Sequence, residues 1–138
     1  MPDASATSLS STANEAYPSA SSIATETMNN SAFPIGEGTN SVYMGIDNMG
    51  TPRYVGITQR DPFIRFAEHL NSSSNRALLQ YNPIYGAQGL SRIQARIIEQ
   101  RLINSYGLGN SGGLLINKIN SISPRYWDNW GITIKINF

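Results

Sequence analysis

Two short β-prone runs separated by a turn form the first regular pattern along the chain. Residues 41–47 contain Val, Tyr and Ile and lead into the turn cluster Asp-Asn-Met-Gly, and residues 52–58 resume with Tyr, Val and Ile. This pattern predicts the two strands of an antiparallel hairpin. Each run carries one tyrosine and, two residues later, one glycine: Tyr43 and Gly45, then Tyr54 and Gly56. Glycine inside a strand indicates that backbone or substrate approaches closely there.

A helix is predicted directly after the hairpin. Asp61 followed by Pro62 is a start signal, because the carboxylate caps the first turn and the proline sits where an N–H would have no helical partner. The helix is expected to end near Leu70. Its apolar stripe at helical spacing consists of Phe63, Phe66, Ala67 and Leu70. Arg65 and His69, four residues apart, are expected together on the opposite side.

Two further segments have strand-like patterns. Residues 78–87 are aromatic and aliphatic, but Pro83 interrupts them. Because proline cannot donate to a hydrogen-bond ladder, this segment is predicted to be an edge strand or a bulged one. Residues 131–138 alternate Ile or Phe with polar residues, which predicts an extra, half-buried C-terminal strand.

A second, longer helix is predicted over SRIQARIIEQRLINSY. Ser91 is its N-cap, and Gly107 takes the C-terminal glycine position. Aliphatic side chains occupy most of its circumference, so the helix is expected to be largely buried. Glu99 lies among them, and a carboxylate in such surroundings needs a partner. A structural partner would be Arg96 or Arg92, in a partly buried salt bridge.

Composition limits the classes of site that the chain can hold. Its 138 residues suffice for one domain, predicted over residues 41–138, whereas residues 1–40 are rich in Ser, Thr and Ala and are predicted to be a flexible leader or linker. The chain has no cysteine and one histidine. Disulfides, thiolate metal sites and multi-histidine zinc sites are therefore excluded. With no run of about 18 apolar residues, no membrane span is expected.

Charge is divided unevenly along the chain. Residues 1–40 carry four acidic residues and no Lys or Arg, whereas residues 41–138 carry ten basic residues against five acidic ones. Eight of the ten cations are arginines. Since the planar guanidinium suits phosphate, the folded part is expected to meet a polyanion.

A small set of side chains would serve phosphodiester hydrolysis: Tyr43, Tyr54, Arg65, His69 and Glu99, with Asn117 or Asn120 behind them. The reaction needs an activated water, neutralised phosphoryl charge and a stabilised leaving oxygen. A carboxylate holding one Mg²⁺, an arginine on the phosphate and a phenol or imidazole near the water would supply these. Each residue alone also has a structural reading as packing, a solvated face, an ion pair or a turn cap.

The order of these residues resembles that of the GIY-YIG nuclease family. Tyr54-Val55-Gly56 matches the second half-motif, and Ser41-Val42-Tyr43 stands where Gly-Ile-Tyr would be. The resemblance covers about residues 41–120. The stretches GLSRIQARIIEQRLINSYGL and NKINSISP also resemble the nuclease domains at the C-terminal ends of bacterial polymorphic toxins, of the contact-dependent inhibition or Rhs type.

The resemblance implies an α/β (α+β) fold, with a three-stranded antiparallel sheet flanked by helices. By that likeness Glu99 holds a single divalent ion, Mg²⁺ or Mn²⁺, and Arg65 contacts the scissile phosphate. Tyr43, Tyr54 and His69 would surround the attacking water, with Tyr54 preferred as the general base and His69 as its rival. Asn117 is preferred over Asn120 as the late asparagine of the family. Further contacts to the substrate are expected from Arg53, Arg60 and Lys118.

The implied function is a metal-dependent endonuclease that acts, as a monomer, on nucleic acid, with DNA favoured over RNA. As a toxin effector in bacterial competition it would be secreted or delivered and would act in the cytoplasm of the target cell. An acidic immunity protein is the expected protein partner, by electrostatic complementarity. Three alternatives remain open at this point: a toxin that cleaves tRNA or another RNA, a nucleic-acid-binding module without chemistry, and an interaction domain for an acidic protein.

Overall fold

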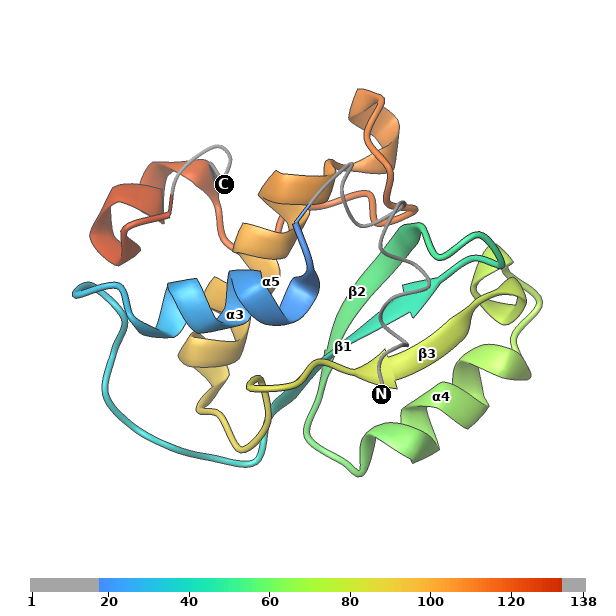
Figure 1. Cartoon of the computed structure of the whole chain (residues 1–138), viewed down its shortest axis with the longest axis horizontal. Helices are drawn as coiled ribbons and strands as arrows, with labels where there is room; N and C mark the ends of the chain where they lie inside the picture. Colours follow the sequence, from blue (N-terminus) through green and yellow to red (C-terminus); the bar gives the residue numbers. More distant parts are fainter. Residues whose placement is uncertain (1–17, 133–138) are drawn as a thin grey trace.

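A computed structural model describes residues 18–132 and has an α+β architecture (Figure 1). The strands form one antiparallel sheet in the order β2-β1-β3, with β1 at Ser41–Ile46, β2 at Pro52–Thr58 and β3 at Gln80–Pro83. The α-helices are α3 at Ala20–Met28, α4 at Pro62–Leu70 and α5 at Arg92–Tyr106. Three short 3₁₀ helices complete the described elements: η1 at Asn75–Leu78, η2 at Gly109–Ser111 and η3 at Pro124–Trp130. The predicted three-stranded sheet with flanking helices is confirmed.

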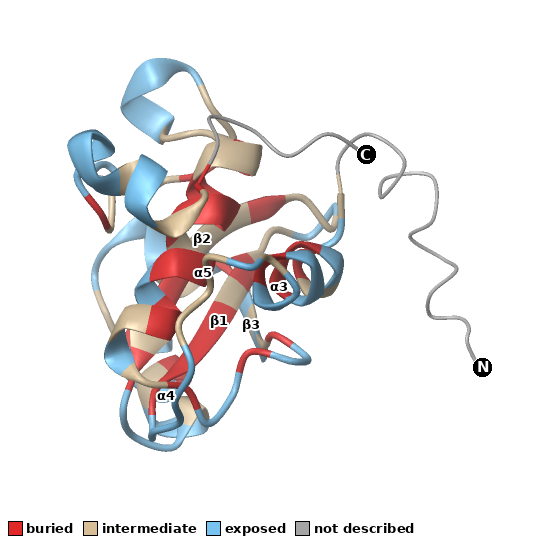
Figure 2. Cartoon of the chain, turned by 90° about the vertical axis from the view of Figure 1, so that its left-hand side faces the viewer, coloured by how far each residue is buried: buried red, intermediate tan, exposed pale blue. Residues whose placement is uncertain are grey.

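The two faces of the sheet have different partners. Side chains alternate along a strand, and the register pairs Tyr43 with Gly56 and Met44 with Val55. The face that carries Val55 meets α5 and α3, whereas the face that carries Tyr43 meets α4 (Figure 1). Buried positions accordingly concentrate in the sheet and in α5 (Figure 2). The sheet thus separates an aliphatic core from an aromatic layer.

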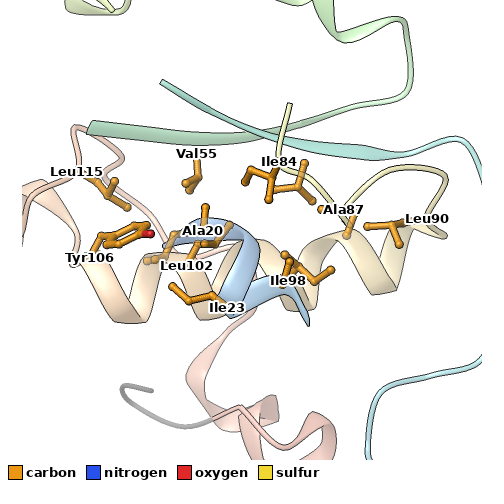
Figure 3. Packing of buried hydrophobic residues seen from close by; sticks show 14 residues of the cluster. Ala20, Ile23, Val55, Ile84, Ala87, Leu90, Ile98, Leu102, Tyr106 and Leu115 are labelled. Atoms are coloured by element: carbon orange, nitrogen blue, oxygen red, sulfur yellow. The ribbon is translucent and has the colours of Figure 1, made fainter. Parts of the chain in front are cut away.

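The aliphatic core lies between the sheet, α5 and α3. Figure 3 shows Ile23, Val55 and Leu102, from three different elements, in one cluster. α5 begins with a capping box, in which Ser91 and Gln94 each satisfy the other's backbone N–H, and it ends at Gly107 with φ 89°. The predicted caps and the buried character of this helix are confirmed.

α3 occupies part of the range predicted to be a flexible leader, residues 1–40. Its inward side is made of Ala20, Ile23, Ala24 and Thr27, at helical spacing, and all four are buried. Three of these four side chains are small or polar, so the hydrophobic pattern of this helix is weak in the sequence. Burial of Thr27 leaves no unpaired hydroxyl, because its Oγ1 donates a hydrogen bond to the carbonyl of Ile23, at 2.6 Å. The leader prediction therefore fails over α3, and residues 1–17 lie outside the described part of the chain.

α4 has the predicted bounds, but the side chains that it buries differ from those expected. Phe66 and His69 are its buried residues, whereas Phe63 is 65% exposed and Leu70 is 53% exposed. Of the predicted apolar stripe only Phe66 is buried, and the expectation that His69 lies on the free side of the helix is wrong. The physical reason is that α4 packs on an aromatic face of the sheet. The flat ring of a histidine can stack on such a face, so His69 is buried there.

β3 lies at the edge of the sheet and ends at Pro83, which confirms the predicted edge strand. The C-terminal strand predicted over residues 131–138 falls almost wholly outside the described residues, which end at 132. Within residues 18–132, every helix is too short or too polar to cross a bilayer.

Candidate active site

A cavity of about 620 Å³ runs along the outer edge of β2. Its walls come from both faces of the sheet: β1 and β2 contribute tyrosines, α4 and η1 contribute arginines, and α5 contributes a carboxylate. The loop 116–121 closes it. Six of the predicted site residues line the cavity: Tyr43, Tyr54, Arg65, Glu99, Asn117 and Lys118.

Behind the cavity, Tyr43 and His69 form a buried polar pair. Tyr43 Oη and His69 Nε2 are joined by a hydrogen bond of 2.7 Å, and the two residues are 1% and 2% exposed. Burial raises the pKa of Tyr43 far above its ordinary value, and the charge of Tyr54 adds to that rise. Burial, and then the positive charge of Arg65, lower the pKa of His69 to about 4. Both side chains are therefore neutral at pH 7. His69 does not line the cavity, but its ring contacts Tyr54, which does, with centroids 5.2 Å apart.

Tyr81 completes the aromatic layer and was not singled out in the sequence. Its ring stacks on His69, with centroids 4.8 Å apart and planes at 20°, and its hydroxyl donates to the carbonyl of Arg76 at 2.7 Å. Burial raises the pKa of Tyr81 to about 12, so this phenol also stays protonated. The sequence gives no sign of this position, because β3 is an edge strand and Pro83 interrupts its pattern.

The two glycines of the hairpin make room for these rings. Gly56 lies opposite Tyr43 in the register, and a Cβ built there would be 2.5 Å from the Tyr43 hydroxyl oxygen. A Cβ on Gly45 would be 2.7 Å from a ring carbon of Tyr81. The close approach expected at each glycine is thus made by a tyrosine of the protein itself.

Arg65 is held at the cavity by a carboxylate of its own helix. Its Nη1 donates to Glu68 Oε1 at 2.9 Å, and Arg60 donates to the same oxygen at 2.7 Å. These two hydrogen bonds lower the pKa of Glu68 to about 2, so the carboxylate stays charged. Of the three predicted substrate contacts, Arg60 and Arg53 do not line the cavity, and Lys118 does.

Glu99 projects from α5 into the cavity and is the only carboxylate among the described lining residues. Burial raises its pKa, and hydrogen bonding from Ser121 and the charges of Arg92 and Arg96 only partly oppose that rise. Within residues 18–132, no ion pair joins Glu99 to either arginine. The guanidinium of Arg96 donates instead to the carbonyl of Ser121. The salt bridge considered as the structural reading of Glu99 is therefore not formed.

The donor set around Glu99 fits a hard divalent cation with few protein ligands. Among the residues that the structure describes, no three His, Asp or Glu side chains come together. Mg²⁺ usually keeps several waters and takes one or two carboxylates, with substrate phosphates as further ligands. One desolvated carboxylate in an open cavity matches that pattern.

Asn117 anchors the cavity wall to the sheet. Its Oδ1 accepts from the backbone N–H of Val55 at 3.0 Å, and its Nδ2 donates to the carbonyl of Val55 at 2.8 Å. The backbone N–H of Ile116 donates to the carbonyl of Arg53, at 2.6 Å. The Asn117 amide thus replaces a neighbouring strand along β2, and both of its polar ends are in use.

Cations dominate the charge of the cavity. Five of them line it against the single carboxylate: Arg65, Arg76, Arg92, Arg96 and Lys118. Arg76 was not singled out in the sequence, where it stands in a polar stretch without periodicity, and its guanidinium lies 4.9 Å from the ring centroid of Tyr54. Arg92 and Arg96, which the sequence predicts as partners of Glu99, also line the cavity. The cavity as a whole therefore suits an anion with several charges.

Comparison with known proteins adds no further identification. No family model, no curated protein and no solved structure matches the chain. Functional inference therefore rests on the geometry and charge of the cavity.

Proposed function

We propose that this chain is a metal-dependent endonuclease of the GIY-YIG type, which hydrolyses phosphodiester bonds in nucleic acid, preferably DNA. The observation that carries the proposal is one cavity lined by Tyr43, Tyr54, Arg65 and Glu99, which come from four different elements. If each of these four residues had only a separate structural role, their side chains would not need to line the same cavity. Their shared surface supports a shared reaction.

Binding of the substrate follows from the charge of the cavity. Five cations against one carboxylate favour a polyanion, and arginine forks match the geometry of phosphate oxygens. In this proposal Arg65 takes the scissile phosphate, because it lines the cavity and its guanidinium is held by a hydrogen bond to Glu68. Lys118 and Arg76 bind neighbouring phosphates as less constrained charges.

Tyr54 is the residue assigned to accept the proton of the attacking water. Tyr43 is a poorer choice, since burial raises its pKa strongly and its hydroxyl is bonded to His69. His69 is poorly placed, since its Nε2 is engaged by Tyr43 and its ring lies outside the cavity lining. Tyr43 and His69 then serve as the rigid, neutral floor under the reacting groups.

Glu99 is the residue that would hold Mg²⁺ or Mn²⁺, and the ion would supply charge neutralisation at the phosphoryl group and at the leaving oxygen. Within the chain, burial disfavours the ionised form of Glu99, and a bound cation would offset that cost by stabilising the carboxylate. The toxin role, delivery into the cytoplasm of a target cell and an acidic immunity protein belong to the same proposal. A basic cavity is the surface that an acidic inhibitor would cover.

The test is cleavage of plasmid DNA and of total RNA by the purified chain, with Mg²⁺, with Mn²⁺ and with EDTA. Glu99→Gln should lower the cleavage rate by about 100-fold or more, since a metal ligand acts on several kcal/mol of transition-state charge. Glu37→Gln is the matched control, because Glu37 is exposed and lies outside the cavity lining. Cleavage by Glu99→Gln at the wild-type rate would refute the metal assignment. Metal-independent binding without any cleavage would instead identify a nucleic-acid-binding module, which the charge of the cavity alone also favours.

A further inference from the structure

Gln100 is a fully buried polar residue next to Glu99 on α5, and the proposed chemistry does not use it. Its Oε1 accepts from the backbone N–H of Ile122, at 2.8 Å. Its Nε2 donates to Asn104 Oδ1 at 3.0 Å and to Asn120 Oδ1 at 2.8 Å. Both polar atoms of this amide are therefore engaged, with Asn104 of α5 and with Asn120 and Ile122 at the end of the loop 116–121.

The direction of these hydrogen bonds is fixed by the backbone. The N–H of Ile122 can only donate, so the oxygen of the Gln100 amide must face it. The nitrogen of the same amide then faces Asn120, and Asn120 must present its oxygen in return. This chain of donors and acceptors leaves the Nδ2 amino group as the polar end of Asn120 that is available to a ligand.

Asn120 lines the cavity, whereas Gln100 does not. Within the described part of the chain, its Nδ2 donates to no acceptor, in contrast to the amide of Asn117, which Val55 engages at both ends. The two asparagines of the loop thus differ in kind. Asn117 ties the loop to β2, and Asn120 offers a neutral donor to the cavity.

We propose that Asn120 Nδ2 donates a hydrogen bond to a non-bridging phosphate oxygen of bound nucleic acid, and that Gln100 is the positioning residue that fixes this polarity. The identity of the ligand rests on the proposed function. Phosphate oxygen is the acceptor that the surroundings favour, because Arg96 and Lys118 line the same cavity and draw an anion to it. A neutral donor between cations does not add to the charge attraction. It orients the phosphate, because its hydrogen bond requires an oxygen at a defined position.

The experiment measures binding in EDTA, so that it does not depend on cleavage. The probes are a short fluorescein-labelled DNA duplex and a labelled RNA hairpin, titrated by fluorescence anisotropy. Asn120→Asp should weaken binding of the preferred probe about tenfold, because the carboxylate still accepts from Gln100 and turns a negative oxygen toward the phosphate. The matched control is Asn104→Asp, which adds the same charge to the other partner of Gln100 outside the cavity lining. The control should bind like the wild type.

Gln100→Glu tests the positioning role without changing an atom of the cavity wall. When it is ionised, the new carboxylate still accepts from Ile122 but cannot donate, so Asn120 must turn its amide and present Oδ1 to the phosphate; binding is therefore compared across pH, because the protonated form would donate as Gln100 does. Binding should again weaken by about tenfold, with the slope of log Kd against log salt unchanged, since no cation is lost. A displaced loop would lower that slope, because Lys118 would move with it. Circular dichroism establishes that each variant is folded.

Wild-type affinity in folded Asn120→Asp, or an equal loss in Asn104→Asp, would overturn the inference, and so would a lowered salt slope in Gln100→Glu. If Gln100→Glu does not fold, the pair of aspartate variants still decides. Binding without cleavage would refute only the nuclease proposal, whereas a wild-type chain that binds neither probe would overturn both.

Discussion

At the scale of single residues, the site is organised by neutral groups that are kept neutral by burial. Tyr43, His69 and Tyr81 form a stacked and hydrogen-bonded layer whose pKa values burial moves away from pH 7. The layer lies between the sheet and α4, so it supports the cavity without competing for phosphate. The charges that line the cavity come from four arginines, Lys118 and Glu99 instead.

The single histidine gives this arrangement a pH signature. The pKa of His69 in the folded chain is about 4, below the ordinary value of 6.5, so between these values the unfolded chain binds the extra proton. The free energy of unfolding should therefore fall as pH decreases from about 6.5 toward about 4, and this loss should be absent above pH 7. Thermal melts across this range check the expectation.

His69→Gln provides the comparison for those melts, because it removes the only imidazole in the chain. Glu99 acts with the opposite sign, since a carboxyl with a raised pKa in the folded state gains stability as pH falls. It is present in both proteins, so the difference between wild type and His69→Gln isolates the imidazole. An equal pH dependence in the two would contradict the assignment of a buried neutral His69.

At the scale of elements, local signals in the sequence predicted where segments begin and end better than which way they face. The caps at Asp61 and Ser91 are short-range chemistry, and both are confirmed. The orientation of α4 depends on the aromatic face beneath it, to which Tyr81 belongs, and no pattern within the helix reveals that face. Three of the four residues in the apolar stripe of α4 are consequently exposed, and only Phe66 is buried.

Two phenylalanines of α4 separate these orientations experimentally. Phe66 is 5% exposed and packs edge-on against Tyr43 with centroids 5.3 Å apart, whereas Phe63 is 65% exposed. Phe66→Ala should lower the free energy of unfolding by about 3–5 kcal/mol, the usual cost of emptying a buried aromatic site. Phe63→Ala is the matched variant and should cost less than about 1 kcal/mol. Urea unfolding measures both, and a larger loss for Phe63→Ala would restore the orientation predicted from the sequence.

At the scale of the whole molecule, six of the predicted site residues line one cavity, whereas Arg53, Arg60 and His69 do not, and Arg76 lines it without having been predicted. Glu99 and the hairpin tyrosines share a cavity, although tens of residues separate them in the sequence. Arg76 had no periodic signal because it lies in a short irregular segment, and α3 had none because its inward side is small. Contacts of this kind depend on the assembled tertiary structure rather than on any local pattern.

The contribution of α3 to the core can be measured with two isoleucines. Ile23 is fully buried in the cluster of α3, α5 and the sheet, whereas Ile35 is 103% exposed. Ile23→Ala should lower the free energy of unfolding by about 2–5 kcal/mol, through lost burial and the cavity that remains. Ile35→Ala should leave it within about 0.5 kcal/mol. Equal and small effects in urea would mean that the segment is a leader after all.

The double hydrogen bond between Asn117 and Val55 has a consequence for self-association. β2 is an outer strand, and an outer strand with free N–H and C=O groups is a template on which another chain can add. Asn117 and the N–H of Ile116 occupy the polar groups of Val55 and Arg53 on that side. The segment that forms one wall of the cavity therefore also covers the outer edge of β2 and blocks its pairing with a strand of another chain. A substitution that detaches this segment would open the cavity and, at the same time, expose the unpaired backbone groups of β2 to other chains.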